Sequence, residues 1–156
     1  MASNSQMSLL LILTCILALT SSISATPTIY EVFNQYGFPP GILPDSVESY
    51  SLTGDTFVVY LKKPCYVQYD YLIHFDTEIS GKISYGKMTG LKGVSAQSFW
   101  FWFNVDEIKV DGHSLQFTIG IISSKSDIAQ FEKIPVCKDK ALVAYDGPSS
   151  KLISQV

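Results

Sequence analysis

The side chains with catalytic potential are few, and most of them fall in one short stretch. The chain has two histidines, His74 and His113. His74 alternates with Asp70 and Asp76, so these side chains would share one face of a β-strand and could form a hydrogen-bonded pair or offer metal ligands. We prefer the simpler interpretation of a row of solvated polar side chains. His113 follows an Asp-Gly pair and is expected in an exposed turn.

A serine nucleophile is the next chemistry to consider. Ser95 stands between Gly93 and Gln97 in a stretch that lacks the second glycine of a nucleophile elbow. A triad with His74 and an aspartate is conceivable, but a triad is defined by geometry. We therefore expect no catalytic residues and keep a weak esterase-type hydrolase as an alternative, in which Ser95→Ala would abolish ester turnover.

Metal and cofactor motifs are absent from the sequence. An acidic cluster lacks the spacing of an EF-hand and is better explained as a charged strand end. The cysteines have no ligand-spaced companions for zinc, and no glycine-rich phosphate motif is present. We expect neither a metal nor a cofactor. The acidic cluster comprises Asn104, Asp106, Glu107 and Asp111.

The N-terminus resembles a secretory signal peptide. An uncharged apolar run from Leu9 to Leu19 is followed by small residues and Pro27, although the preceding segment has no Lys or Arg. The run is shorter than the roughly 20 residues that a membrane span needs. We predict a signal peptide over residues 1–25, a secreted protein, and no stable membrane span after cleavage.

Cleavage would remove Cys15 and leave Cys65 and Cys137. In an oxidising compartment these two have one intramolecular pairing available, and we predict a structural disulfide. Two buried thiols, or one redox thiol, are the alternatives. The rest of the chain is read as a single domain over residues 26–140 and a polar tail, expected to be disordered, over residues 141–156.

Composition narrows the class of protein. The net charge is −3 and no long run of one sign occurs, which argues against a nucleic-acid partner. Aromatic residues make up 13% of the chain, and Val, Ile, Tyr, Phe and Thr dominate its middle, as in a half-buried sheet. These observations predict a mainly β domain.

One helix is expected near the start, over residues 28–36. Thr28 and Glu31 have the spacing of a capping box, the apolar residues repeat on one face, and Gly37 follows as a C-terminal cap. So short a helix must dock on something else. The proline-rich segment 38–44 then predicts a rigid extended link without helix or central strand.

Period-two alternation follows and predicts strands. One face of the longest stretch would carry Cys65, Phe75 and the apolar residues between them. The glycines of residues 86–97 suggest an irregular loop or a sharply bent strand, and a short helix is expected after Ser126. The expected strands are 47–53, 55–62, 65–76, 78–85, 98–110 and 114–122, with hairpin turns at 53–55 and 111–113.

The run of aromatic residues at 99–103 is the main hint of a binding site. Alternation places its phenylalanines on one face and its tryptophans on the other. If the phenylalanines build the core, the tryptophans could line a ligand cavity with nearby tyrosines. Alternatively, the N-terminal helix covers the indoles. The expected ligand-binding residues are Trp100, Trp102, Tyr69, Tyr71 and Tyr85.

Residues 37–44, GFPPGILP, resemble the "Gly-Leu-Pro-x-Gly-Leu-Leu-Pro" signature of a plant-specific secreted family of unknown function. Phe38 and Ile42 stand where Leu is usual, and Asn104 where Asp is common. The similarity spans roughly residues 28–140. Further matches in the same order are Cys65, the segments 69–72, 79–86 and 102–108, Phe131 and Cys137.

This resemblance implies an antiparallel β-barrel or strongly curved sheet with the short N-terminal helix packed on it. Such proteins are likened to the bactericidal/permeability-increasing lipid-binding proteins, which implies a lipid, lipopolysaccharide or pigment ligand. The family has no established catalytic residues. We therefore expect an extracellular, apoplastic protein that binds an amphipathic or apolar small molecule, and the further alternative is a protein or cell-wall interaction module.

Overall fold

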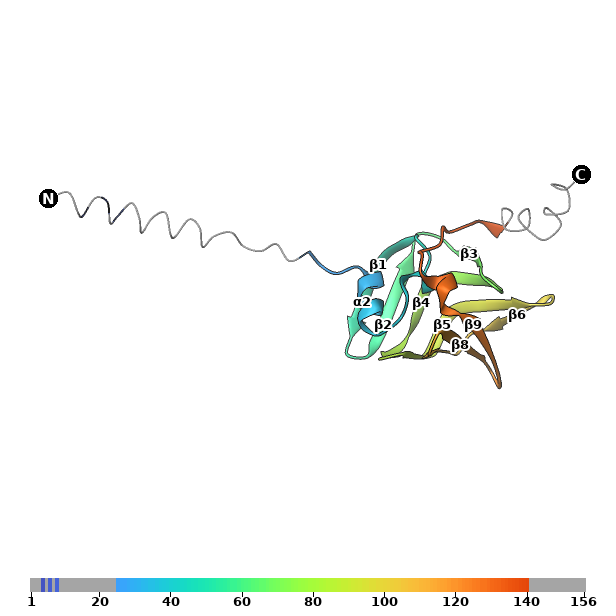
Figure 1. The fold of residues 1–156 in the computed structure, drawn as a ribbon. Helices are drawn as coiled ribbons and strands as arrows, with labels where there is room; N and C mark the ends of the chain where they lie inside the picture. The colour runs from blue at the N-terminus through green and yellow to red at the C-terminus, as the bar shows by residue number, and fades with distance from the viewer. Residues whose placement is uncertain (1–3, 5, 7, 9–24, 141–156) are drawn as a thin grey trace, which may run out of the picture.

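The structure is a computed structural model that describes residues 4, 6, 8 and 25–140, and within these residues it is mainly β (Figure 1). Most of the predicted signal peptide 1–25 and all of the predicted tail 141–156 lie outside the described residues. The strands are β1 Val47–Thr53, β2 Thr56–Leu61, β3 Cys65–Gln68, β4 Leu72–Ser84, β5 Lys87–Ser98, β6 Phe101–Asn104, β7 Glu107–Asp111, β8 Ser114–Ile119 and β9 Ile122–Asp127.

All nine strands belong to one antiparallel sheet, in the order β1-β2-β4-β5-β7-β8-β9. β3 pairs with β4, and β6 pairs with β5, outside this path. In the described residues no ladder joins β1 to β9, so the sheet is open and the barrel alternative is not confirmed. Side chains make the contacts between β9 and the β3–β4 turn, as shown by the hydrogen bond between Tyr71 Oη and Ser124 Oγ at 3.1 Å.

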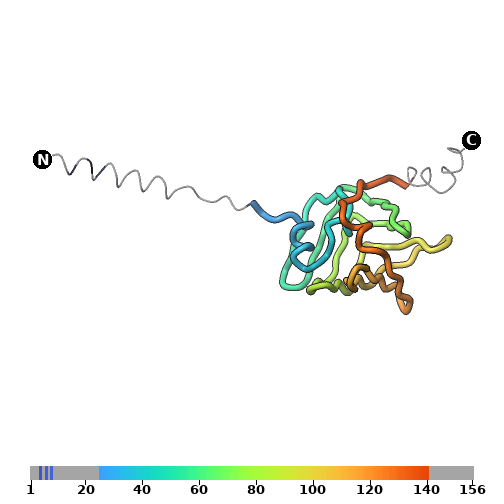
Figure 2. The backbone as a smooth tube through the Cα atoms, in the orientation of Figure 1, coloured from blue at the N-terminus to red at the C-terminus, as the bar shows by residue number. Residues whose placement is uncertain are grey.

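The two longest strands carry the sheet around a bend. One half of β4 and β5 pairs with β3 and β6, and the other half pairs with β2 and β7. The register shifts between Phe75 and Ser80, opposite Gly93, which has φ +81°. A Cβ at Gly93 would lie 2.1 Å from the carbonyl oxygen of Glu78, so glycine lets the backbones approach at the bend. Figure 2 shows the resulting curved backbone.

Helix α2, Ile29–Gln35, forms as the sequence predicts. The Thr28 and Glu31 capping box is present, and the hydrogen bonds from Thr28 lower the pKa of the Glu31 carboxyl. Gly37 follows with φ +83°. The helix docks through Phe33, whose ring lies edge-on to Phe57 of β2 with the centroids 5.2 Å apart.

Several predicted elements differ from the structure. Residues 65–76 form a hairpin rather than one strand, because Tyr69 N–H bonds to Tyr71 C=O and reverses the chain. The chain over 86–97 is the bent strand β5, and 98–110 is divided into β6 and β7. Residues 122–127 add β9, which the sequence analysis did not predict. The segment 38–44, predicted to be wholly extended, contains the 3₁₀ turn η1 Pro40–Ile42. The short helix predicted after Ser126 is the 3₁₀ turn η2 Ile128–Phe131.

The predicted disulfide between Cys65 and Cys137 is confirmed, with the two Cα atoms 5.3 Å apart. It ties β3 to the segment that follows η2. Lys138 exchanges backbone hydrogen bonds with Tyr66, and Cys137 N–H donates to Asp45 Oδ1 at 2.8 Å. The C-terminal part of the described chain is therefore attached to the sheet at several points.

Candidate ligand-binding site

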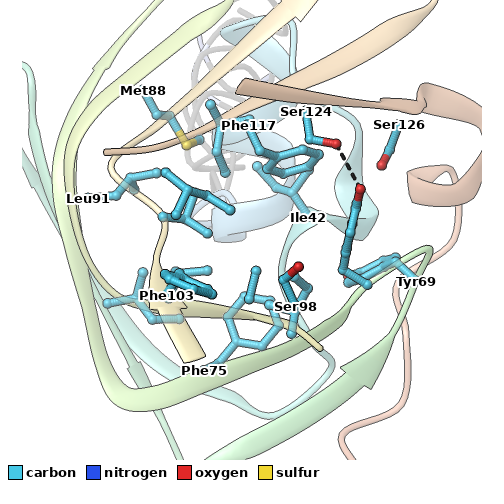
Figure 3. Close-up of a pocket in the computed structure, with 18 of the residues that line it drawn as sticks. Ile42, Tyr69, Phe75, Met88, Leu91, Ser98, Phe103, Phe117, Ser124 and Ser126 are labelled. Atoms are coloured by element: carbon cyan, nitrogen blue, oxygen red, sulfur yellow. Dashed lines mark hydrogen bonds between the residues drawn. The ribbon is translucent and has the colours of Figure 1, made fainter. Parts of the chain in front are cut away.

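The concave side of the bent sheet encloses a cavity of about 530 Å³ (Figure 3). Its lining is almost wholly apolar, and among the described residues that line it none carries a charged side chain. The lining side chains come from α2, η1, η2 and every strand except β1 and β3. The polar groups that line it are the hydroxyls of Ser98, Ser124, Ser126, Tyr69 and Tyr71.

Cross-strand register explains why the cavity stays open. Ile73, Ala96 and Phe103 are partners on β4, β5 and β6, and all three line the cavity. Directly opposed residues point to the same face of a sheet. A small alanine therefore lies between two large side chains, and the space above its methyl group is left unfilled.

Tyr69 closes one wall of the cavity. Its hydroxyl donates to the carbonyl oxygen of Gly41 at 2.6 Å, and its ring centroid lies 4.6 Å from that of Phe131. Burial raises the pKa of the Tyr69 phenol above its ordinary value of 10.0, so the group stays neutral. The backbone of Gly41 lies close to that of Phe131, because a Cβ at Gly41 would be 2.4 Å from the carbonyl oxygen of Phe131.

The mouth of the cavity is framed by the β3–β4, β5–β6 and β8–β9 turns. Tyr71, Phe101, Phe103 and Ile122 line the cavity and are also exposed to solvent. The β5–β6 and β8–β9 hairpins extend away from α2 (Figure 1). The ends of these hairpins, residues 93–105 and 114–124, contain no charged residue, and the Asp106 carboxylate accepts from Gly120 N–H at 2.8 Å beside the β8–β9 turn.

The residues predicted to bind a ligand divide into two groups. Tyr69 and Tyr71 line the cavity, whereas Trp100, Trp102 and Tyr85 do not. Trp100 is 87% exposed at the β5–β6 turn, and Tyr85 is exposed in the β4–β5 turn, at the other end of these strands.

Trp102 lies on the other face of the sheet, against Tyr66 and His74, with ring centroids 5.9 and 6.0 Å away. The alternative in which the N-terminal helix covers the indoles also differs from the structure, because α2 packs on Phe57. The alternation of residues 99–103 was predicted, but it does not say which face is concave. The cavity lies on the phenylalanine face.

The candidate catalytic residues lie on the face opposite the cavity. His74 and Ser95 are direct cross-strand partners, and His74 Nδ1 is 3.5 Å from Asp76 Oδ1. However, Ser95 Oγ–H donates to Asn104 Oδ1 at 3.2 Å rather than to the imidazole. Within the described residues no cluster of His, Cys, Asp or Glu could hold a metal ion. In the part of the chain that is described, no helix is long and apolar enough to cross a membrane.

These features define a mainly β protein with one open sheet bent around an apolar cavity. The chain belongs to the family described as "Protein of unknown function, DUF538", which matches residues 29–132. No curated protein and no solved structure matches the chain.

Proposed function

We propose that this protein binds a single apolar or amphipathic small molecule, such as a lipid, in the cavity on the concave side of its sheet. The cavity is the observation that carries the proposal. Its volume of about 530 Å³ falls within the 300–1,000 Å³ that is typical of small-molecule sites. Uncharged apolar walls favour a ligand that water solvates poorly, at roughly 25 cal/mol for each Å² removed from water.

The few polar groups of the cavity suggest how a ligand is oriented. The hydroxyls of Tyr71 and Ser124 bond to each other, and Tyr71 is exposed at the mouth. The hydroxyl of Tyr69 already donates its hydrogen bond to the carbonyl oxygen of Gly41. An amphipathic ligand would therefore place its chain in the interior and its polar group beside Tyr71 and Ser124.

The proposed location is extracellular, in the apoplast. The Cys65–Cys137 disulfide supports it, because such bonds persist in oxidising compartments. The predicted signal peptide points the same way. The likeness to the bactericidal/permeability-increasing proteins stays a prediction, and it agrees with a lipid as the ligand.

Native mass spectrometry of the protein recovered from expressing cells, with lipid extraction of the same sample, tests the proposal. We expect a co-purifying small molecule, or the uptake of one molecule of added long-chain fatty acid per chain. A protein that carries nothing and takes up nothing would contradict it. A cell-wall or protein interaction module would have a packed core, which the cavity argues against, and a large exposed apolar patch, which the side chains of Phe99, Trp100 and Ile121 agree with.

One observation favours a hydrolase as a second candidate, namely the pairing of His74 with Ser95 in adjacent strands. Rotation of Ser95 Oγ away from Asn104 would be needed before the imidazole could accept its proton. Turnover of a chromogenic ester that Ser95→Ala abolishes without a change in stability would support this function. Equal turnover by both proteins would exclude it.

A further inference from the structure

We propose that the β5–β6 and β8–β9 turns form a docking surface for a lipid bilayer of zwitterionic lipids. We define the mouth tips as residues 99–101 and 120–122. This inference rests on the proposed function for its purpose, since it concerns how an apolar ligand reaches the cavity. Its physical basis lies in residues outside the buried core, and the two are tested by different measurements.

The mouth tips display large apolar side chains that nothing in the described residues covers. Phe99 is 91% exposed and Ile121 is fully exposed, with Trp100, Phe101 and Ile122 beside them. Phe99, Phe101, Ile121 and Ile122 also line the cavity, so both tips flank the same mouth. Exposed apolar residues gathered in this way typically mark an interaction site.

Charge identifies the partner as a lipid surface. Residues 93–105 and 114–124 contain no Asp, Glu, Lys or Arg, and the charged group bonded to a mouth tip is the anionic Asp106 carboxylate, which accepts from Gly120 N–H at 2.8 Å. Tryptophan and phenylalanine prefer the interface between hydrocarbon and water, whereas attraction to anionic lipids requires Lys or Arg near the surface. With a net charge of −3 and no basic residue at the tips, the partner that fits is a zwitterionic bilayer.

The backbone at Phe99 provides a second, independent observation. Phe99 has φ +55° in the two-residue turn between the paired residues Ser98 and Phe101. This first turn position favours glycine, and a bulky residue there is an outlier. Because the Phe99 ring is exposed, packing within the fold does not offset the strain. Insertion of the ring into a bilayer would do so.

The arrangement allows a ligand to move without contact with bulk water. If the mouth tips enter the interfacial region, the opening between them faces the acyl chains. A lipid could then slide into the cavity chain first, and its polar group would stop beside Tyr71 and Ser124. Docking would therefore bring the protein to a source of ligand and open a path for the ligand from the bilayer into the cavity.

Tryptophan fluorescence reports on docking directly, because the chain has two tryptophans. The Trp102→Phe variant of the full chain, as recovered from expressing cells, keeps Trp100 as its single indole. Added phosphatidylcholine vesicles should shift its emission to shorter wavelength, and brominated phosphatidylcholine should quench it. Emission that vesicles leave unchanged, with no quenching, would overturn the proposal.

Matched variants separate docking from folding and from ligand binding. Phe99→Gly removes the ring and relieves the backbone, so it should fold at least as well as the parent while vesicle partitioning falls about tenfold. Ile121→Ser should act in the same direction. Tyr85→Ser, at an exposed aromatic in the distant β4–β5 turn, should partition like the parent.

Ligand occupancy, measured by native mass spectrometry on the same variants, distinguishes the two proposals. Vesicle binding without any cavity ligand would overturn the proposed function and leave docking in place. Equal partitioning of Phe99→Gly, Tyr85→Ser and the parent would overturn docking alone. The parent could also form a concentration-dependent dimer that Phe99→Gly abolishes, without binding vesicles. That result would show that the mouth tips bind a second copy of the chain, and it would overturn the docking proposal.

Discussion

Phenylalanine side chains are buried at one end of the sheet and exposed at the other. At the α2 end Phe33 and Phe57 meet edge-on and are almost fully buried. At the mouth Phe99 and Phe101 are 91% and 68% exposed. Burial of an aromatic side chain stabilises the fold, whereas exposure of one contributes nothing to it. The difference indicates that the aromatic residues of the α2 end, which also line the cavity, support stability, and it agrees with the proposal that the mouth serves binding.

The largest effect that would test this comparison is truncation of one phenylalanine at each end. Phe57→Ala should lower the free energy of unfolding by about 3–5 kcal/mol, because it removes a buried ring beside Phe33. Phe101→Ala should change it by no more than about 0.5 kcal/mol. Urea unfolding of both variants measures the contrast, and similar losses would show that the mouth also belongs to the core.

The bend that makes the sheet concave should be nearly as sensitive. Gly93→Ala places a Cβ against the carbonyl oxygen of Glu78 at positive φ and should cost about 2–5 kcal/mol. Gly90 is the matched control, because it has φ +58° and no atom within 4 Å of an added Cβ. Gly90→Ala should cost only about 1–2 kcal/mol. If chemical denaturation showed equal losses of stability for the two variants, the close approach of Gly93 to Glu78 would not be the cause of the destabilisation.

At the mouth a substitution should stabilise the protein. Phe99→Gly relieves about 1–2 kcal/mol of strain at positive φ, and the greater unfolded-state entropy of glycine offsets about 0.5–1 kcal/mol of it, so we expect the free energy of unfolding to rise by up to about 1 kcal/mol. Calorimetry would show a higher Tm. A lower Tm would mean that the Phe99 ring packs on the fold and does not await a partner.

The smallest effect concerns the wall of the cavity at alkaline pH. Burial raises the pKa of Tyr69, so above pH 10 the unfolded chain loses this proton and the folded chain keeps it. The free energy of unfolding should therefore fall as pH rises beyond 10, and Tyr69→Phe should reduce that slope. Part of the slope should remain in this variant, because burial and, to a smaller extent, the charge of Asp45 also raise the pKa of Tyr30. An unchanged slope in Tyr69→Phe would contradict a buried phenol.

How much the sequence could predict depends on the range of the interactions. The capping box of Thr28 and Glu31 is local, and the helix it predicts is present. The turn at Tyr69, Asp70 and Tyr71 was missed because cross-strand partners share a face. Cys65 pairs with Phe75 and Val67 with Ile73, so the hairpin keeps the same inward set as one long strand.

The site was harder to predict than the elements. Alternation is confirmed for Phe101, Trp102 and Phe103 of β6, whereas Phe99 and Trp100 lie in a turn; alternation does not reveal which face is concave, and the sheet bends at Gly93. That bend depends on the approach of Glu78, which is remote in sequence. The small Ala96 between Ile73 and Phe103 becomes informative only once the strand register is known.

The most direct test of the central claim, that the cavity binds an apolar ligand, is a titration with a fluorescent long-chain fatty acid. Ala96→Met should occupy part of the cavity beside Ile73 and Phe103, and Gln97→Met changes the neighbouring residue, which does not line it. We predict saturable binding of one molecule by the parent and by Gln97→Met, and an affinity about tenfold lower for Ala96→Met, or about 1.4 kcal/mol. No saturable binding, or equal binding by all three proteins, would contradict the claim.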